Sequence, residues 1–480
     1  GRPGEALADR VVIYCGPGNN GGDGYAMARL LDARGYAVDL FRVGRRPGGD
    51  ARLQLEILER SGHDVTPITD AATLSAALAR GAAADLVVDA LFGAGLSRPL
   101  DGQPAALVRG FQQLTTPLLA VDLPSGLDAS RATPIGPFAP ADLTVTFAAP
   151  KIAHVLAPTC DAMGDVVLVD LGIPPELVAE APGSRHLTTR EDAAAQVLEG
   201  DPSAHKGTFG HALLIAGSRG LSGAAVLAAR AAVRGGAGLT TVAVPSGLVD
   251  VLETSSFESM TLGLGGAALL EAADVDRLLD AGAGKASAVL GPGLGRAPST
   301  GDAVSRLVAE LDTPLVLDAD ALFALGTRFD ALAARRTPAI LTPHPGEMAR
   351  LLGTDAEAVE ADRPAAALEL AARSGQIAVL KGRRTLVASP DGELWINPTG
   401  NAGMATGGSG DVLAGLLGAL LAQGYDAPAA AALGVYLHGL AGDLAVEKTG
   451  RAALAAGDLV LSLGAAWRTL GGAAPDTLEA

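Results

Sequence analysis

The chain has 480 residues, 49% of them hydrophobic and 3% aromatic, which is enough for two or three domains with large cores. A formal net charge of −17 excludes a typical nucleic-acid-binding protein, which needs a basic surface. No apolar stretch has the length and purity of a membrane span, the start GRPGEALADR has no signal-peptide pattern, and two cysteines give neither a disulfide framework nor a zinc site. We therefore expect a cytoplasmic α/β protein.

The chain opens with a predicted βαβ unit. A buried parallel strand at 11–15 is followed by the glycine-rich loop GPGNNGGDG at 16–24, a helix and a second strand at 36–43. The loop contains the G-x-G-x-x-G pattern, and Asp39 is predicted to end the second strand, as in dinucleotide-binding units. An NAD-dependent dehydrogenase is therefore one candidate function.

Three polar residues of this loop, Asn19, Asn20 and Asp23, are not required by the dinucleotide fingerprint. Two amides and a carboxylate on one tight turn can orient a ligand or coordinate a cation. The alternative is that they only form the turn, since Asn and Asp favour turns.

Three further predicted strands carry polar residues at their ends. Asp89 ends the first, Asp122 and Ser125 follow the second, and Lys151 follows the third. Because the carboxyl ends of parallel strands meet at one edge of a sheet, we expect these residues and Asn20 to line one crevice. Asp122 and Lys151 are candidates for an acid/base pair.

The segments GPGNNGGDG, DALFGAGL, VDLPSGLD and TFAAPK resemble the epimerase domain of the NAD(P)H-hydrate repair enzymes. The resemblance implies that this domain interconverts the R and S forms of the hydrated nicotinamide cofactor. It also implies that Asn20, Asp89 and Ser125 help to hold a potassium ion and that Asp122 contacts the substrate. The implied dinucleotide-binding residues are Asn19, Asn20, Gly21, Gly22, Asp23, Gly93, Ala94, Gly95, Leu96, Ser97 and Arg98.

Members of this family usually carry a helical segment of several dozen residues before the first strand, and it contributes to packing and self-association. The sequence begins shortly before its first strand. We expect an epimerase domain truncated at its start, within a homo-oligomer.

We place the domain boundary after residue 184. The APGS stretch at 181–184 has the composition of a linker, and LTTRED at 187–192 has the Thr-x-x-Asp pattern of a helix start. The predicted domains are therefore 1–184 and 185–480.

The second domain repeats the alternation of strands and helices. Gly217, Gly220, Gly223 and Ala224 form a surface without large side chains, which suits either a flat ring or pyrophosphate, or close helix packing. Later strands end at GPGLG (291–295), at Asp318 and Asp320, at TPHPGE (342–347) with His344 and Glu347, and at KGRRT (381–385), which precedes a hairpin at Asp391-Gly392.

The segment TGNAGMATGGSGD at 399–411 contains five glycines and runs into an apolar helix. Glycines at a helix start leave backbone amides free to hold an anion, and Asp411 is then suited to act as a base beside a phosphate. The alternative is that Asp411 caps the helix. The segment is not a Walker A loop, because no GK[ST] follows at the required spacing.

Ribokinase-type kinases share the G-x-G-D ending, in which the aspartate deprotonates the acceptor hydroxyl. The ordered segments HKGTFG, AGSRGLSGAA, GPGLG, HPGE, KGRRT and AGMATGGSGDVLAG resemble, more narrowly, the NAD(P)H-hydrate dehydratase domain of that superfamily. The resemblance implies two three-layer αβα domains, the first Rossmann-like and the second ribokinase-like. It also implies that nucleotide phosphorylates the C6 hydroxyl of the S hydrate and that phosphate then leaves.

In this resemblance Asp411 is the base and Gly410 holds the transferred phosphate. Lys381, Gly382, Arg383, Arg384 and Thr385 bind the nucleotide, and Ala224, Gly293 and His344 contact the hydrated cofactor. The expected cofactors are ADP, with ATP as the alternative, and Mg²⁺, with K⁺ in the first domain.

Two competing hypotheses remain. One is a vitamin or sugar kinase fused to a non-catalytic dinucleotide-binding domain, and the other is a non-catalytic scaffold. The dehydrogenase is disfavoured because no paired histidine and acid follow the fingerprint.

Overall fold

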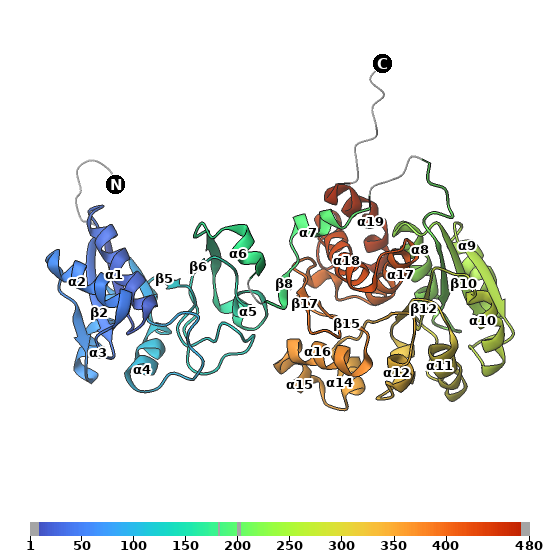
Figure 1. The fold of residues 1–480 in the computed structure, drawn as a ribbon, viewed down its shortest axis with the longest axis horizontal. Helices are drawn as coiled ribbons and strands as arrows, with labels where there is room; N and C mark the ends of the chain where they lie inside the picture. Colours follow the sequence, from blue (N-terminus) through green and yellow to red (C-terminus); the bar gives the residue numbers. More distant parts are fainter. Residues whose placement is uncertain (1–8, 181–182, 199–202, 472–480) are drawn as a thin grey trace, which may run out of the picture. The chain divides into compact units, whose positions relative to one another are not determined.

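A computed structural model describes residues 9–180, 183–198 and 203–471. The chain divides into two compact units, Gly1–Ala181 and Pro182–Ala480, each built on its own sheet (Figure 1). The linker predicted at 181–184 lies partly outside the described residues, and the boundary after residue 184 stays a prediction.

In the first unit seven strands form a parallel sheet in the order β3-β2-β1-β4-β5-β6-β7. The strands are β1 (Arg10–Cys15), β2 (Ala37–Val43), β3 (Thr66–Ile68), β4 (Leu86–Ala90), β5 (Leu118–Val121), β6 (Leu143–Phe147) and β7 (Asp165–Val169). The α-helices are α1 (Asn19–Asp32), α2 (Gly49–Arg60), α3 (Ala71–Ala82), α4 (Gly102–Phe111), α5 (Ile152–Val155) and α6 (Pro175–Glu180).

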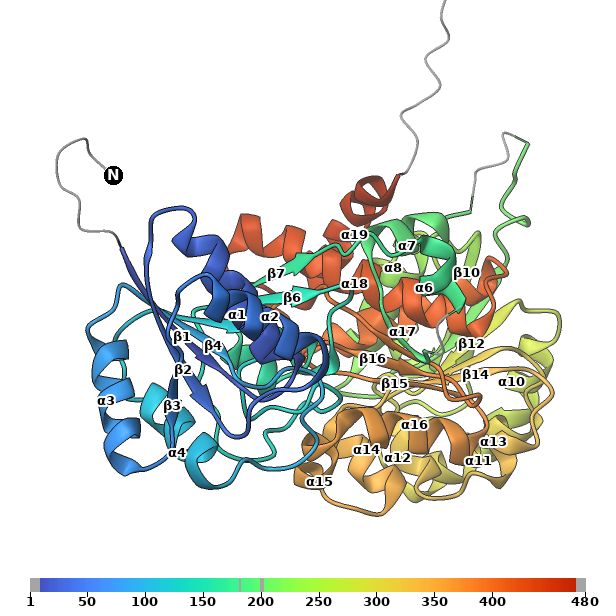
Figure 2. The same ribbon diagram turned by 60° about the vertical axis from the view of Figure 1, so that its left-hand side comes forward.

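Helices cover both faces of this sheet, because alternate strand residues point to opposite sides. Ile13 packs with Tyr25 of α1 and Leu55 of α2, whereas Tyr14 packs with Ala77 of α3 and Phe111 of α4. Figures 1 and 2 show the two helix pairs on opposite sides of the strands. The expected three-layer αβα arrangement is therefore present.

Two details of the opening βαβ unit differ from the sequence prediction. Helix α1 begins at Asn19, inside the predicted loop, so Gly21 and Gly22 are buried helix residues. Strand β2 continues to Val43, which leaves Asp39 near its start, where it forms ion pairs with Arg10 and Arg80. The prediction that Asp39 ends the strand is wrong. The dinucleotide fingerprint requires an acidic residue at the end of this strand, and Asp39 does not occupy that position.

In the second unit ten strands have the order β11-β10-β9-β12-β13-β14-β15-β16-β17-β8. They are β8 (Arg185–Leu187), β9 (His211–Ile215), β10 (Leu239–Pro245), β11 (Met260–Leu264), β12 (Ser287–Leu290), β13 (Leu315–Leu317), β14 (Ala339–Leu341), β15 (Ile377–Leu380), β16 (Leu386–Ala388) and β17 (Leu394–Ile396). The pairs of β16 with β15 and β17 are antiparallel and the others are parallel.

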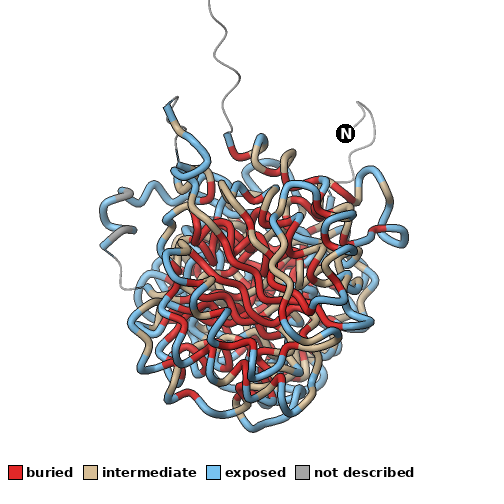
Figure 3. Tube along the Cα trace, turned by 90° about the vertical axis from the view of Figure 1, so that its right-hand side faces the viewer, coloured by how far each residue is buried: buried red, intermediate tan, exposed pale blue. Residues whose placement is uncertain are grey.

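The α-helices of this unit also form two layers. They are α7 (Arg190–Ala195), α8 (Ser222–Arg234), α9 (Val249–Ser255), α10 (Val275–Gly282), α11 (Pro298–Glu310), α12 (Asp320–Leu325), α13 (Asp330–Ala333), α14 (Pro345–Leu352), α15 (Ala356–Ala361), α16 (Arg363–Ser374), α17 (Ser409–Ala422), α18 (Ala427–Thr449) and α19 (Ala456–Leu470). Figure 1 shows α17, α18 and α19 on one side of the sheet and α11, α12, α14 and α16 on the other. In Figure 3 the buried segments lie inside and the exposed ones outside.

Two sequence predictions are confirmed at the level of hydrogen bonds. Thr189 caps α7 and exchanges hydrogen bonds with Asp192, and β16 and β17 form a hairpin through Gly392, whose φ is +95°. One expectation differs, because α18 is long and apolar enough to span a membrane by length and composition. Within the fold 67% of its most apolar window is buried, as in the core helix of a soluble protein.

Two candidate active sites at strand ends

In the first unit the predicted polar residues meet at the carboxyl end of neighbouring strands. β1, β4, β5 and β6 are adjacent. β1, β5 and β6 lead into Gly16, Asp122 and the loop before Lys151, and Asp89 is the second-to-last residue of β4. This edge is where ligands bind in open parallel sheets.

Asp122 and Lys151 form the centre of this site. Nζ of Lys151 lies 2.7 Å from Oδ1 of Asp122, which also accepts a hydrogen bond from Thr146, while Oδ2 accepts one from the amide of Ala94 at 2.7 Å. Burial raises the pKa of Asp122, but the hydrogen bonds from Lys151 and Ala94 outweigh burial and lower it overall. Asp122 is therefore an ionised carboxylate, held in a left-handed backbone conformation with φ of +68°.

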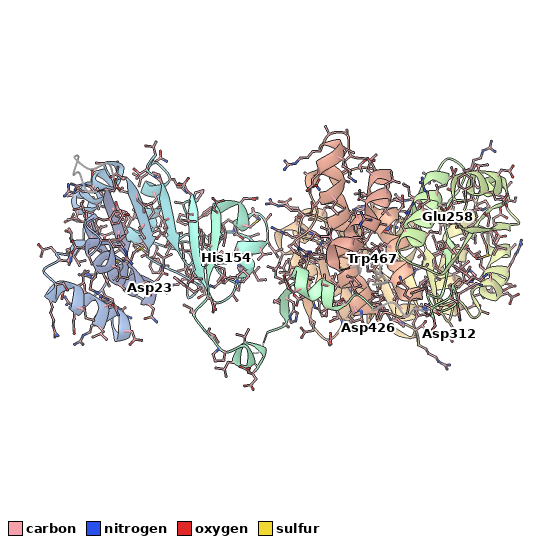
Figure 4. The ribbon with its side chains drawn as sticks, turned by 90° about the horizontal axis from the view of Figure 1, so that it is seen from above. Asp23, His154, Glu258, Asp312, Asp426 and Trp467 are labelled. Carbon is pink, nitrogen blue, oxygen red and sulfur yellow. The ribbon has the colours of Figure 1, made fainter. Side chains whose placement is uncertain are left out.

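His154 of α5, labelled in Figure 4, forms hydrogen bonds with the backbone of both residues. Its Nδ1 accepts the backbone amide of Lys151 at 2.9 Å, so Nε2 carries the proton and donates to the carbonyl oxygen of Asp122 at 2.8 Å. Burial lowers the pKa of His154 and keeps the ring neutral. The sequence analysis did not identify His154 as a site residue.

Asp89 and Ser125 form a second, deeper pair. The carboxylate of Asp89, 1% exposed, accepts hydrogen bonds from the Ser125 hydroxyl at 2.6 Å and the Ser125 amide at 2.8 Å. Burial raises the pKa of Asp89 to about 6. Asn20 lies next to the Gly93 loop, and its buried Nδ2 has no hydrogen-bond partner among the described residues. A ligand acceptor would satisfy this amide.

The remaining predicted residues of the first unit divide into two groups. Gly21 and Gly22 are packing residues, since an added Cβ would lie 2.1 Å from the carbonyl oxygen of Gly16 and 2.9 Å from Ala51. Leu96 packs against the core. The exposed residues, whose side chains or backbone are open to a ligand, are Asn19, Asp23, Ala94, Gly95, Ser97 and Arg98.

In the second unit, adjacent strands likewise end at the predicted motifs. β12, β13, β14 and β15 lead into Gly291, Asp318, Thr342 and Lys381. Asp318, 1% exposed, accepts hydrogen bonds from Thr342 and Lys381, both at 2.7 Å. The four strand ends thus build one charged cluster.

Asp411 lies in the first turn of α17, beside this cluster. The N-cap residue is Gly408, with φ of +93° and no side-chain cap, so Asp411 is not the helix cap. Among the described residues none donates a hydrogen bond to the Asp411 carboxylate. Burial, together with Asp318, raises the pKa of Asp411 to about 7, although Lys381 acts in the opposite direction. A carboxylate with such a pKa is suited to act as a base near neutral pH.

Lys381 is the positive charge of the cluster. Its Nζ lies 3.8 Å from Oε2 of Glu347, in addition to its contact with Asp318. Burial lowers the pKa of Lys381, but Asp318 and Glu347 outweigh burial and raise it overall. Gly410 approaches so closely that an added Cβ would lie 3.2 Å from this ammonium group. The predicted nucleotide-binding lysine and the predicted base therefore belong to one site.

Two of the predicted substrate residues contact each other. A Cβ added to Gly293 would lie 2.8 Å from the Cβ of Ala224, and Gly293 has φ of +62°, a conformation that favours glycine. The same turn contacts α12, which begins two residues after Asp318, because the amide of Gly295 donates to Oδ2 of Asp320 at 2.9 Å. The third predicted residue, His344, caps α14, and its Nε2 lies 3.5 Å from Oε1 of Glu347.

The loop 381–385 is braced by a buried arginine. The guanidinium of Arg363, on α16, donates hydrogen bonds to the carbonyl oxygens of Leu380, Lys381 and Arg383. Thr385 donates to the carbonyl oxygen of Gly382 at 3.1 Å, and Arg384 donates to that of Pro398. These hydrogen bonds constrain the conformation of the loop.

Two family models and several known proteins match this chain. A family model described as NAD(P)H-hydrate dehydratase matches residues 212–462, and one described as YjeF-related protein N-terminus matches residues 4–153. A bifunctional NAD(P)H-hydrate repair enzyme of Moorella thermoacetica is 44% identical over 95% of this chain and 87% of its own length. The chain belongs to the family of bifunctional NAD(P)H-hydrate repair enzymes.

Other members and structures support this assignment. The bifunctional NAD(P)H-hydrate repair enzyme of Escherichia coli is 35% identical over 94% of this chain and 84% of its own length. An ADP/ATP-dependent NAD(P)H-hydrate dehydratase from Bacillus subtilis, co-crystallised with ATP and Mg²⁺, is 33% identical with a TM-score of 0.53 and covers 60% of this chain and 99% of its own. A ribokinase-like protein of Enterococcus faecalis, 25% identical over 61% of this chain and 98% of its own, also has a TM-score of 0.53. The vitamin or sugar kinase hypothesis is not favoured.

The sequence analysis did not assign several residues that lie in or beside the second site. Asp318 and Glu347 were noted at strand ends but not assigned to the site, although a strand-end position is the signal that could have found them. His438 and Asp443 lie on α18 and hold the glycine segment. Nε2 of His438 lies 3.0 Å from the carbonyl oxygen of Ser409, and Asp443 accepts hydrogen bonds from Gly400 and Asn401. Nothing in the local sequence of α18 identifies them.

Proposed function

We propose that this protein repairs hydrated NAD(P)H. Residues 1–184 interconvert the R and S hydrates, and residues 185–480 dehydrate the S hydrate at the expense of ADP, giving NAD(P)H, AMP and phosphate. The observation that carries this proposal is Asp411, a half-buried base of pKa about 7 at an amide-lined helix start, in a chain 44% identical to a repair enzyme.

The dehydration follows from the arrangement of the second site. Asp411 takes the proton of the C6 hydroxyl group. The hydroxyl oxygen attacks the β-phosphoryl group of ADP at the same time, and AMP leaves. The amide of Gly410 and the ammonium of Lys381 stabilise the charge on the transferred group. Phosphate then departs from C6 with the bonding electrons, C5 loses a proton, and the ring double bond forms again.

Mg²⁺ would enter this site together with the nucleotide. No group of three or more His, Cys, Asp or Glu side chains among the described residues is arranged to hold a metal ion. Mg²⁺ is commonly held by one or two carboxylates together with substrate phosphates, so Glu347 and the ADP phosphates fit this need. The metal supplies charge neutralisation for the phosphates.

In the first site Asp122 and Lys151 would move the proton needed when the bond at C6 breaks and forms again. The oxygen atoms of Asn20, Asp89 and Ser125 suit K⁺, and no lysine or arginine pairs with Asp89 among the described residues. A bound cation would stabilise the Asp89 carboxylate. Testing K⁺ against Na⁺ by both epimerase rate and Tm checks this site, and identical responses to the two ions would contradict it. Self-association and a cytoplasmic location stay predictions from the sequence.

The test is recovery of the reduced-nicotinamide absorbance from mixed R and S NADH hydrate with Mg²⁺ and ADP or ATP. Full recovery with ADP supports both activities. Recovery that ends when the S form is consumed leaves only the dehydratase. No recovery with either nucleotide contradicts the proposal.

A further inference from the structure

Next to the charged cluster of the second unit lies a cavity of about 380 Å³. It is lined by Arg296, Leu322, Phe323, His344, Gly346, Glu347 and Arg350. It adjoins the proposed reaction site through Glu347, which lies 3.8 Å from Nζ of Lys381. Only His344 among these residues was predicted to contact the hydrated cofactor.

Two arginines of this cavity stack on one aromatic ring. The guanidinium carbon of Arg350 lies 3.8 Å from the ring centroid of Phe323, and that of Arg296 lies 4.4 Å from it. Stacking holds each guanidinium plane while its N–H donors stay available at the edge. The cavity therefore presents positioned, planar cations.

The charges of the two arginines are only partly neutralised. Nε of Arg296 donates to Oδ1 of Asp320 at 2.9 Å, whereas no acidic side chain among the described residues lies within ion-pair distance of Arg350. The start of α14 offers no competing anion site, because the amides of Gly346 and Glu347 already donate to Nδ1 of His344. The unsatisfied positive charge of the cavity thus resides on Arg350.

We propose that Arg350, assisted by Arg296, binds a phosphate group of the hydrated dinucleotide. This inference rests on the proposed function of the same site. The hydrated nicotinamide ring is uncharged and needs no cation, whereas paired guanidinium groups match phosphate oxygens in charge and in bidentate geometry. The phosphate is either the diphosphate shared by NADH and NADPH hydrates or the 2′-phosphate found only in the NADPH form.

The test compares Arg350→Gln with a matched control, Arg373→Gln. Arg373 also stacks on an aromatic ring, that of Phe329 at 5.1 Å, but does not line the cavity. For Arg350→Gln we expect KM for the hydrate to rise about tenfold, with kcat and KM for ADP changed less than about twofold, since a charge-assisted contact to a non-reacting group is lost. Fluorescence titration with NADPH, without nucleotide, should show the same loss of affinity.

Assays with NADH hydrate and NADPH hydrate separate the two phosphates. An equal loss for both identifies the diphosphate, and a loss confined to the NADPH hydrate identifies the 2′-phosphate. A wild-type KM for both hydrates in Arg350→Gln, or a change in KM for ADP alone, would overturn the inference. Because these constants are compared with a wild-type enzyme that recovers NAD(P)H, this failure is distinct from failure of the proposed function, in which the wild type itself is inactive.

Discussion

The two sites use the same residue types at the same edge of a sheet but balance their charges differently. In the first, Lys151 contacts Asp122 at 2.7 Å, and the pKa of Asp122 is lowered. In the second, Lys381 contacts Asp318 and lies near Glu347, and burial together with Asp318 raises the pKa of Asp411 to about 7. Burial favours the neutral form of both aspartates, and hydrogen bonds from Lys151 and Ala94 outweigh burial only at Asp122.

The largest expected effect is that of Asp411→Asn. Turnover of the S hydrate should fall by about two to four orders of magnitude, while the Kd for ADP stays near the wild-type value, because only the base is removed. Because the pKa of Asp411 is raised from 3.8 to about 7 in the folded state, the wild type loses stability as the pH rises through this range, and at pH 8 it carries the full cost of the buried charge. The variant should therefore have a higher Tm than the wild type at pH 8, since asparagine is neutral. Near-normal turnover would exclude Asp411 as the base.

Asp122→Ala tests the first site in the same way. It should lower epimerisation by about a hundredfold or more and leave dehydration of the S hydrate unchanged, because the two aspartates belong to different units. The measurement is the rate of each step with separated R and S hydrates. Loss of both activities in a protein of unchanged Tm would mean that one site serves both reactions.

A smaller effect is expected in the pH dependence. The kcat/KM of the dehydratase should fall as the pH drops through about 7, since Asp411 must be ionised, whereas lowering of the Asp122 pKa predicts no such fall for the epimerase in this range. In Asp318→Asn, Lys381 no longer faces a carboxylate at 2.7 Å and the repulsion on Asp411 is removed. The midpoint of the dehydratase profile should then move to lower pH. An unchanged midpoint would show that Asp318 does not control the base.

The smallest effect concerns Arg363, with Arg335 as the control. Arg363 is buried and Arg335 is half-buried, and both donate to backbone carbonyl oxygens, but the acceptors of Arg335 belong to Val308 and Thr313 instead of the loop 381–385. Replacing either by Met should cost about 1–3 kcal/mol of stability, because buried acceptors lose their donors. Only Arg363→Met should also raise KM for ADP, by roughly tenfold or less, through loss of the loop conformation. Equal KM values for the two variants would argue against this positioning role.

The sequence predicts which polar residues lie together in space wherever chain position fixes spatial position. In a parallel sheet every strand end faces the same edge, so Asp122, Lys151 and Lys381 could be assigned to sites from strand ends alone. Two kinds of feature were not predictable. Glycine permits both a ligand loop and tight packing, so Gly21 and Gly22 could not be recognised as helix residues, and long-range partners such as Arg363 approach from helices whose own sequence carries no sign of them.

The sheet order of the second unit also constrains how the chain folds during synthesis. Strand β8, the first of this unit to leave the ribosome, pairs with β17, and the contact between His186 and Glu393 spans 207 residues. The sheet of the first unit, by contrast, is complete at Val169. The first unit can fold while the second is being translated, but β8 cannot pair until β17 has been synthesised. β8 is only three residues long and carries the exposed side chains of Arg185 and His186, and short, charged edge strands disfavour pairing with other chains.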